Sequence, residues 1–207
     1  RLAEEAGLPK PKVYINSMEA PNAFATGRNP EKGVVCLTDG LIEKLDEKEI
    51  EGVIAHELAH IKNRDTLVNA VVATVAGALG FIAEMAFWSS LFTGKEEDGE
   101  MASALALMIL VPLIATVIRL AVSRSMEFRA DSEAVRISGN REGLSNALKK
   151  ISSYAGRKPR KHVTRQQEAG ANLFIENPFS SDSITKYFST HPPLEERLEN
   201  IEDTQTE

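Results

Sequence analysis

Two long stretches without any charged side chain occupy the middle of this chain. Residues 66–83 and 101–118 contain no Asp, Glu, Lys or Arg and are mostly apolar. A helix needs about 20 apolar residues to cross the hydrocarbon core of a bilayer, so each stretch is long enough to span a membrane. The polar segment 94–100 between them predicts a tight hairpin of two membrane helices. The alternative is a helical hairpin buried in a soluble core.

Charges around the hairpin indicate its orientation. The connection contains one positively charged residue, Lys95, whereas the outer ends of the hairpin carry five: Lys62, Arg64, Arg119, Arg124 and Arg129. Because the cytoplasmic flanks of membrane helices are enriched in Lys and Arg, both outer ends are expected in the cytoplasm. Glu84 and Pro112 do not exclude the spans, since a glutamate near a helix end reaches the interface and neighbouring groups accommodate a proline.

Composition limits the classes of protein that this chain can be. With 207 residues, 26% charged and 43% hydrophobic, it has the make-up of a folded domain of ordinary size. Its net charge of −6 and pI near 5.4 argue against nucleic acid as the main partner. The basic run 157–161 is interpreted as a solvated loop, and His162 beside it is assigned no role. The chain begins at Arg1, so we expect a processed product or a fragment, and no signal peptide can be judged.

The cysteine content restricts the possible metal ligands. Cys36 is the sole cysteine and lies in the apolar run 34–37. A single cysteine excludes an internal disulfide, and its apolar neighbours predict a buried structural thiol. Any metal ion must therefore be held by His and carboxylate side chains.

A short motif with two histidines, His56-Glu57-Leu58-Ala59-His60, precedes the first apolar stretch. Residues four apart in a helix share a face, so both imidazoles could bind one divalent ion with Glu57 beside it. This pattern is typical of a zinc hydrolase. The alternative is a surface helix that happens to carry two histidines, and it requires no further ligand elsewhere.

The residues around the motif predict the helix that metal binding requires. Asp46 and Glu49 are spaced as a capping box, so a helix should begin near Asp46. Its apolar residues recur at helical spacing, at Ile50, Val53, Ile54, Leu58 and Ile61. His56 and His60 lie along one edge of this stripe, where two half-buried histidines are expected to bind something.

A further ligand is expected directly after the second apolar stretch, because a hairpin returns the chain to the place it left. Glu127 and Asp131 lie four residues apart there and share one face of a continuing helix. We predict Glu127 as the third ligand. Asp131, one turn further, is predicted to hold the free N–H of a ligating imidazole. The alternative is an ordinary helix surface of mixed charge.

Short β-prone runs precede the helix of the histidine motif. They comprise 13–15, 22–25 and 34–37, separated by Pro, Gly and Asn, and predict a small sheet. An extended substrate can add to a free sheet edge through backbone hydrogen bonds. Asn22, Ala23, Phe24 and Ala25 are the candidate substrate-binding residues, and the alternative is that they form an inner strand.

Taken together, four features in this order resemble the M48 family of membrane zinc peptidases, and most closely its bacterial heat-shock branch. These features are the motif at 56–60, the membrane hairpin, Glu127-Phe128-Arg129-Ala130-Asp131, and the late run 191–197, which reads HPPLEER. The resemblance covers most of the chain, from Pro11 to Leu198. The family also includes the CAAX prenyl proteases.

The resemblance implies several properties of the whole protein. It implies one zinc ion per chain with Glu127 as third ligand, and two further membrane spans upstream. It implies a multi-pass protein of the bacterial inner membrane that cleaves misfolded or damaged membrane proteins under stress. It also suggests that His191 stabilises the oxyanion of the reaction. From the residues alone, His191-Pro192-Pro193 is an extended lead into a helix over 194–201.

The predicted ligand set implies a mechanism. Two neutral imidazoles and one carboxylate leave a positive charge on zinc and an open position for water, whose pKa falls to about 7. Glu57 is then the general base that takes the proton and passes it to the leaving amine. The ligand types would also accept manganese or cobalt.

Three functions remain open at this point. The first is a cytoplasm-facing zinc endopeptidase of misfolded membrane proteins. The second is a more selective peptidase of the CAAX prenyl-processing type, for which two spans, even with two more upstream, are few. The third is a membrane protein whose zinc ion only ties helices together, which would need a fourth protein ligand.

The predicted fold is α+β and mostly helical. A small N-terminal sheet packs on a zincin-type helix with the histidine motif, and a transmembrane hairpin is inserted between the metal ligands. The expected parts are 1–65 with the sheet and this helix, 66–118 with the hairpin, and 119–207 with the third ligand.

Overall fold

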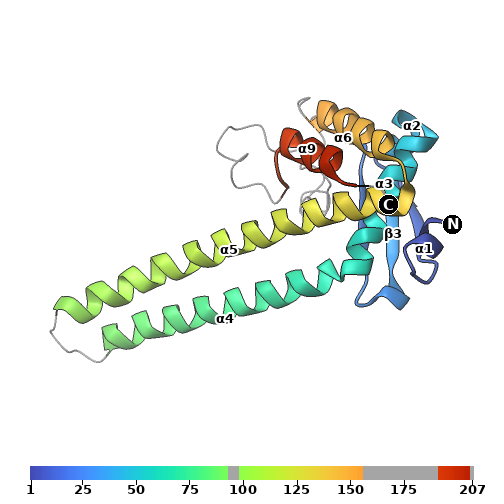
Figure 1. The fold of residues 1–207 in the computed structure, drawn as a ribbon. Coiled ribbons are helices and arrows are strands. Elements are labelled where there is room, and N and C mark those ends of the chain that lie inside the picture. Colours follow the sequence, from blue (N-terminus) through green and yellow to red (C-terminus); the bar gives the residue numbers. More distant parts are fainter. Residues whose placement is uncertain (93–97, 156–190, 206–207) are drawn as a thin grey trace. The chain divides into compact units, whose positions relative to one another are not determined.

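The computed structural model describes residues 1–92, 98–155 and 191–205, with side chains from 1–92, 102–154 and 191–205. It divides into two units, one formed by Arg1–Thr66 with Ser123–Glu207 and the other by Leu67–Val122. The predicted basic run 157–161 and His162 lie outside the described residues, as does most of the predicted connection 94–100. Within the described residues the fold is mostly helical with one small sheet, as predicted (Figure 1).

The first unit combines three short strands with helices, and parts of two long helices form the second. The strands are β1 (Lys12–Asn16), β2 (Ala23–Thr26) and β3 (Val34–Thr38). The helical elements are α1 (Leu2–Glu5), η1 (Pro30–Lys32), α2 (Asp39–Lys44), α3 (Glu47–Asn63), α4 (Asp65–Phe92), α5 (Asp98–Ser138), α6 (Arg141–Ala155) and α9 (Leu194–Asp203).

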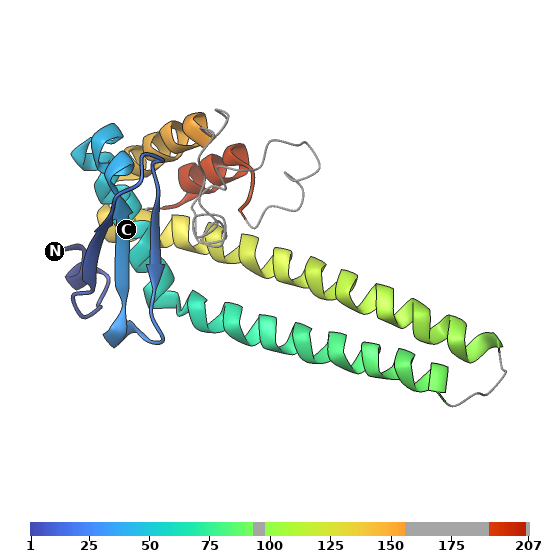
Figure 2. The ribbon, with the colours of Figure 1, turned by 180° about the vertical axis from the view of Figure 1, so that it is seen from behind.

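The sheet has the order β1-β3-β2, so β3 is central and β2 is at an edge of the described sheet (Figure 2). β1 runs parallel to β3, whereas β2 runs antiparallel to it with Ala23 opposite Leu37 and Ala25 opposite Val35. Asn22, just before β2, is buried, and its backbone bonds Thr38. Asn22–Ala25 therefore includes an edge strand and not an inner one.

α3 begins and ends with specific local interactions. The Asp46 side chain accepts from the Glu49 N–H, and Glu49 bonds the Asp46 N–H, which completes the predicted capping box. At the other end Arg64 adopts a left-handed conformation with φ 55°. A left-handed residue ends a helix and lets the chain turn, so Asp65 begins α4 immediately afterwards.

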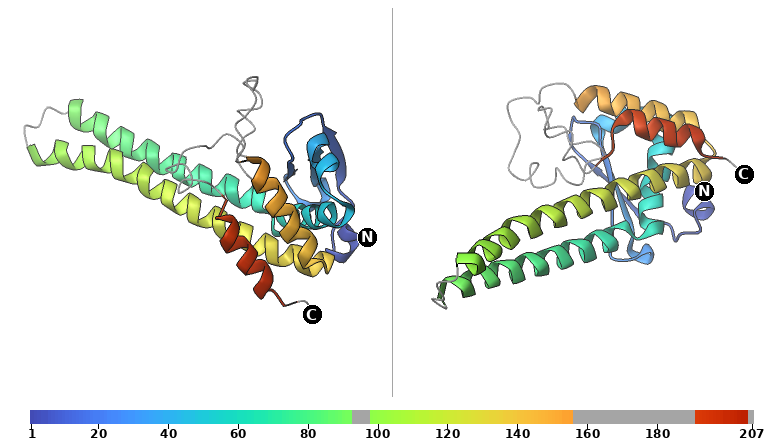
Figure 3. Two further views of the ribbon diagram at one scale, coloured as in Figure 1. Left: turned by 90° about the horizontal axis from the view of Figure 1, so that it is seen from above. Right: turned by 60° about the vertical axis from the view of Figure 1, so that its left-hand side comes forward.

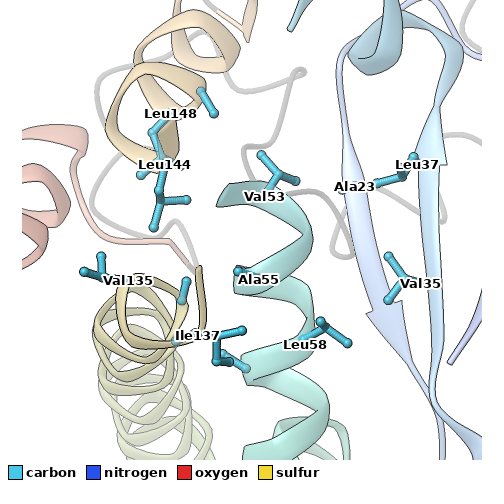
Figure 4. Packing of buried hydrophobic residues seen from close by; sticks show 14 of the residues in the cluster. Ala23, Val35, Leu37, Val53, Ala55, Leu58, Val135, Ile137, Leu144 and Leu148 are labelled. Carbon is cyan, nitrogen blue, oxygen red and sulfur yellow. The ribbon is translucent and has the colours of Figure 1, made fainter. Parts of the chain in front are cut away.

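The hydrophobic core surrounds α3 on two sides (Figure 4). One side packs against the sheet through residues such as Val35 and Leu37, and the other against α5 and α6 through Val135 and Leu144. Cys36 is buried in β3, as predicted. Because α3 is held between two layers, the side chains along its edge have little freedom to move.

α3 and α6 approach each other closely at Gly52. A Cβ atom placed on Gly52 would lie 2.6 Å from the backbone nitrogen of Leu144. Real Cβ atoms do not come that near to backbone, so a larger residue would force the helices apart. α6 in turn packs beside α9, which Figure 3 shows.

The second unit consists of the long apolar parts of α4 and α5. Both helices are long and apolar enough to cross a membrane, and their most apolar windows are 6% and 0% buried within the described structure. A hairpin in a soluble core would be mostly buried, so that alternative is not supported. α4 extends past Glu84 to Phe92, and α5 already begins at Asp98, so residues 98–100 of the predicted connection are helical.

α5 continues as one helix from the apolar stretch to Ser138. Glu127 and Asp131 therefore lie on a regular helix, one turn apart. α9 covers the predicted helix 194–201, and Pro193 is its N-cap residue.

Candidate metal centre

Side chains from α3 and α5 converge on one small cluster. His56 and His60 of α3 and Glu127 of α5 each offer a ligand atom, and these atoms lie within 4.8 Å of one another. The two Nε2 atoms are 3.1 Å apart. His56 Nε2 lies 3.6 Å from Glu127 Oε2, and His60 Nε2 lies 3.5 Å from Glu127 Oε1. His56 and Glu127 are buried, and His60 is partly exposed.

The outer nitrogen of each imidazole faces its own carboxylate. His56 Nδ1 lies 3.0 Å from Asp131 Oδ1, and His60 Nδ1 lies 2.7 Å from Asp65 Oδ2. An ionised carboxylate only accepts hydrogen bonds, so each Nδ1 is the protonated nitrogen. When both imidazoles are neutral, as metal binding requires, their Nε2 atoms direct lone pairs toward the same point.

This donor set fits a tetrahedral metal ion. Ligand distances of about 2.0–2.2 Å require donor atoms about 3.3–3.6 Å apart, and the cluster shows separations of 3.1, 3.5 and 3.6 Å. Two imidazole lone pairs and a carboxylate this close repel one another unless a proton or a metal ion lies between them. The cluster can therefore hold a metal ion.

The pKa shifts of His60 and Glu127 describe how the cluster is protonated without a metal ion. Burial lowers the pKa of His60, but the hydrogen bond that His60 donates to Asp65 and the charges of Glu127, Glu57 and Asp65 raise it to about 9. Burial raises the pKa of Glu127, but His191, Arg197 and His60 bring it well below its usual value. The cluster thus keeps an ionised carboxylate and attracts positive charge.

Glu57 lies on α3 between the two histidines and is 2% exposed. Burial raises the pKa of its carboxyl group, while the charges of His56 and His60 oppose this rise and that of Glu127 adds to it. Glu57 directly follows the ligand candidate His56 in α3. A carboxylate with a raised pKa is a stronger base than an ordinary glutamate and is suited to take a proton and release it again.

Two residues from the C-terminal part reach the same cluster. His191 Nδ1 lies 3.1 Å from Glu127 Oε2, so His191 is brought to the site over a long sequence distance. Arg197 of α9 bonds Asp131 through two nitrogens, at 2.8 and 2.6 Å, and its Nη1 lies 3.5 Å from Glu127 Oε2. Burial raises the pKa of Asp131, but the Arg197 guanidinium outweighs this and lowers it.

A model of the family described as Peptidase family M48 matches residues 1–205. The chain belongs to peptidase family M48. This confirms the family expected from the sequence motifs.

Relatives of this M48 chain include proteins named Protease HtpX homolog. That of Desulfatibacillum aliphaticivorans is 47% identical over 206 residues, which cover 97% of this chain and 65% of the relative. That of Aquifex aeolicus is 47% identical, with 97% and 68% covered. That of Thermodesulfovibrio yellowstonii is 49% identical, with 98% and 72% covered. The M48 chain thus spans about two thirds of the length of these proteins.

A solved structure shares the fold of this M48 chain. The crystal structure of S. mikatae Ste24p superposes with a TM-score of 0.63 and 22% sequence identity, covering 97% of this chain and 48% of that chain. The likeness extends across nearly the whole M48 chain.

Sequence reasoning missed three residues that the structure brings to the cluster's edge: Asp65, Arg129 and Arg197. Asp65 follows His60 by five residues and is the last charge before the first apolar stretch. Arg197 follows His191 by six residues in the HPPLEER run. For Asp65 the available sequence signal was a charged residue at the border of an apolar helix. The partners of that charge are set by tertiary structure.

Proposed function

We propose that this chain is the catalytic part of a membrane zinc endopeptidase. The observation that carries the proposal is the convergence of two imidazole nitrogens and one carboxylate beside the buried Glu57. His56, His60 and Glu127 would hold one zinc ion. A set of three protein ligands leaves a position open for water and substrate, as in catalytic zinc sites.

Each residue near the zinc site has a distinct task. When bound, zinc supplies a Lewis acid that lowers the pKa of water and polarises a carbonyl group. Glu57 takes the proton of the attacking water and passes it to the nitrogen of the leaving amine. His191 donates a hydrogen bond to the oxyanion that forms on the peptide carbonyl. Asp131 holds His56 in the tautomer that the zinc site needs.

The edge strand β2 is the proposed binding site for the polypeptide. The Thr38 N–H bonds the Asn22 carbonyl, and backbone groups alternate sides along a strand. The backbone N–H and C=O groups of Phe24 therefore point to β3, whereas those of Ala23 and Ala25 point to the outer edge. A substrate in extended form would pair with these groups without regard to its own side chains.

Replacing Ala25 with Pro should lower kcat/KM for a polypeptide by about tenfold, because one substrate hydrogen bond is lost. The β2–β3 pairing should survive, since a proline is tolerated where the N–H points off a sheet edge. Val13→Pro is the matched control, because Lys12 bonds Gly33 and so Val13 points off the opposite edge. Equal activity of both variants and the wild type would contradict the assignment of β2.

The substrates are proposed to be misfolded or damaged membrane proteins, cleaved at the cytoplasmic face of the bacterial inner membrane during stress. Support comes from the names of the relatives and from the positive charges at the outer ends of the two apolar helices. The relatives are named as proteases, which does not favour a zinc ion with a purely structural role or a prenyl-processing activity.

Removal of metal is the direct test of this function. The purified protein should contain about one zinc ion per chain and cleave an unfolded membrane protein in detergent. Treatment with a chelator should reduce cleavage to background, and added zinc should restore it, because the nucleophilic water depends on the ion. Cleavage that persists in metal-free protein would refute the proposal, as would zinc-loaded protein that cleaves no unfolded polypeptide.

A further inference from the structure

Asp65 lies at the junction between the helix of the histidine motif and the first apolar helix. α3 ends at Asn63, Arg64 takes the left-handed conformation, and Asp65 is the first residue of α4. Its side chain is 3% exposed although it is charged. Buried charges are costly unless they are paired, so the partners of this carboxylate indicate what it does.

Both oxygens of Asp65 are engaged by side chains from different elements. Oδ2 lies 2.7 Å from His60 Nδ1, on the side of the ring opposite the cluster. Oδ1 accepts a hydrogen bond of 2.5 Å from Arg129 of α5. The Arg129 guanidinium thus holds the Asp65 carboxylate in place, and this carboxylate holds the orientation of the His60 imidazole.

The same arrangement occurs at the other histidine. There His56 faces Asp131, and Asp131 is held by Arg197. The two series of imidazole, carboxylate and guanidinium approach each other at the Nε2 atoms, which are 3.1 Å apart. Asp65 itself lies outside both the histidine motif and the run 127–131, whereas Arg129 belongs to that run.

We propose that Asp65, held by Arg129, is a positioning residue that sets the tautomer and orientation of His60 for metal binding. This inference rests on the proposed zinc site. Because Asp65 begins α4, the ligand His60 is oriented from the start of the apolar helix. The left-handed conformation of Arg64 turns the Asp65 carboxylate back toward α3.

The test is the zinc affinity of the intact membrane protein in detergent, measured by competition with a chelator of known affinity. Asp65→Asn should lower the affinity by about 10- to 100-fold, the usual effect of losing a group that orients a ligand. Arg129→Ala should have a smaller effect, and Arg129→Lys should recover part of it. If Arg129 acts through Asp65, adding Arg129→Ala to Asp65→Asn should cause no further loss.

A second measurement separates positioning from a general effect on folding. The chain has 4 histidines, so NMR of ¹⁵N-labelled histidine can resolve the ring nitrogens of His60. Asp65→Asn should shift the His60 Nδ1 signal and leave that of His56 in place. Glu133→Gln is the control, because it breaks the Lys62–Glu133 ion pair between α3 and α5 and does not alter a metal ligand.

The outcomes separate this inference from the proposed function. Zinc affinity of Asp65→Asn within twofold of the wild type, with an unchanged His60 signal, would overturn the positioning role. An equal fall in the zinc affinity of Glu133→Gln would overturn it too, because any loosening of α3 against α5 would then weaken zinc binding. If the wild type itself binds no zinc, the proposed metal site fails.

Discussion

Glu57→Gln should retain zinc and lose activity, with kcat/KM falling by about 10² to 10⁴-fold, the range expected for removal of a general base. The amide has nearly the shape of the carboxylate but cannot take a proton. The metal ligands His56, His60 and Glu127 are unchanged, so metal content should stay near one ion per chain. Cleavage of an unfolded membrane protein, with metal analysis of the same sample, measures both quantities.

Glu47→Gln is the matched control for this substitution. Glu47 lies in the first turn of the same helix and is exposed. Its replacement removes the same charge without approaching the cluster, so activity should stay near that of the wild type. Full turnover by Glu57→Gln would exclude Glu57 as the base, and loss of zinc from this variant would show that Glu57 supports the metal site instead.

Arg197→Ala should lower the free energy of unfolding of the metal-free protein by about 3–5 kcal/mol, the usual cost of breaking a buried ion pair. Arg197 is 2% exposed and Asp131 is 0% exposed. Removal of the guanidinium would leave the Asp131 carboxylate buried without its main counter-charge. Denaturant or thermal unfolding in detergent, followed by circular dichroism, measures the loss.

Two further variants test the cause of this loss. Adding Asp131→Asn to Arg197→Ala should recover part of the stability, because the stranded charge is then removed. Arg136→Ala, which breaks a surface ion pair of 3.5 Å with Glu133, should cost at most about 1 kcal/mol. A cost for Arg197→Ala no greater than for Arg136→Ala would contradict the role of this buried pair.

Local sequence rules predicted the elements that depend on neighbouring residues. The capping box at Asp46 and the unbroken helix through Glu127 and Asp131 follow from interactions within a few residues. The apolar stretches predicted two long helices, although α4 passes Glu84 because a single charged residue does not end a helix. The edge position of β2 depended on strand order, which no local pattern contains.

The partners of the metal-ligating histidines show the limit of such rules. Asp131 was predicted to hold an imidazole because it lies one turn from Glu127, but its own partner Arg197 comes from α9, 66 residues away. Asp65 is only five residues from His60, yet its reach depends on the left-handed turn at Arg64. Most non-glycine residues disfavour that conformation, so sequence patterns do not predict it.

Sequence patterns were enough to predict that His56 and His60 share one face of a helix with Glu57 beside them, that two apolar helices follow, and that the chain is a member of peptidase family M48. These properties depend on residue spacing and motif order. The pairing of each imidazole with a carboxylate, and of each carboxylate with a guanidinium, became visible in the folded molecule. Such buried charges are stable only in pairs, and the pairs form between residues that become neighbours when α3, α5 and α9 pack around one core.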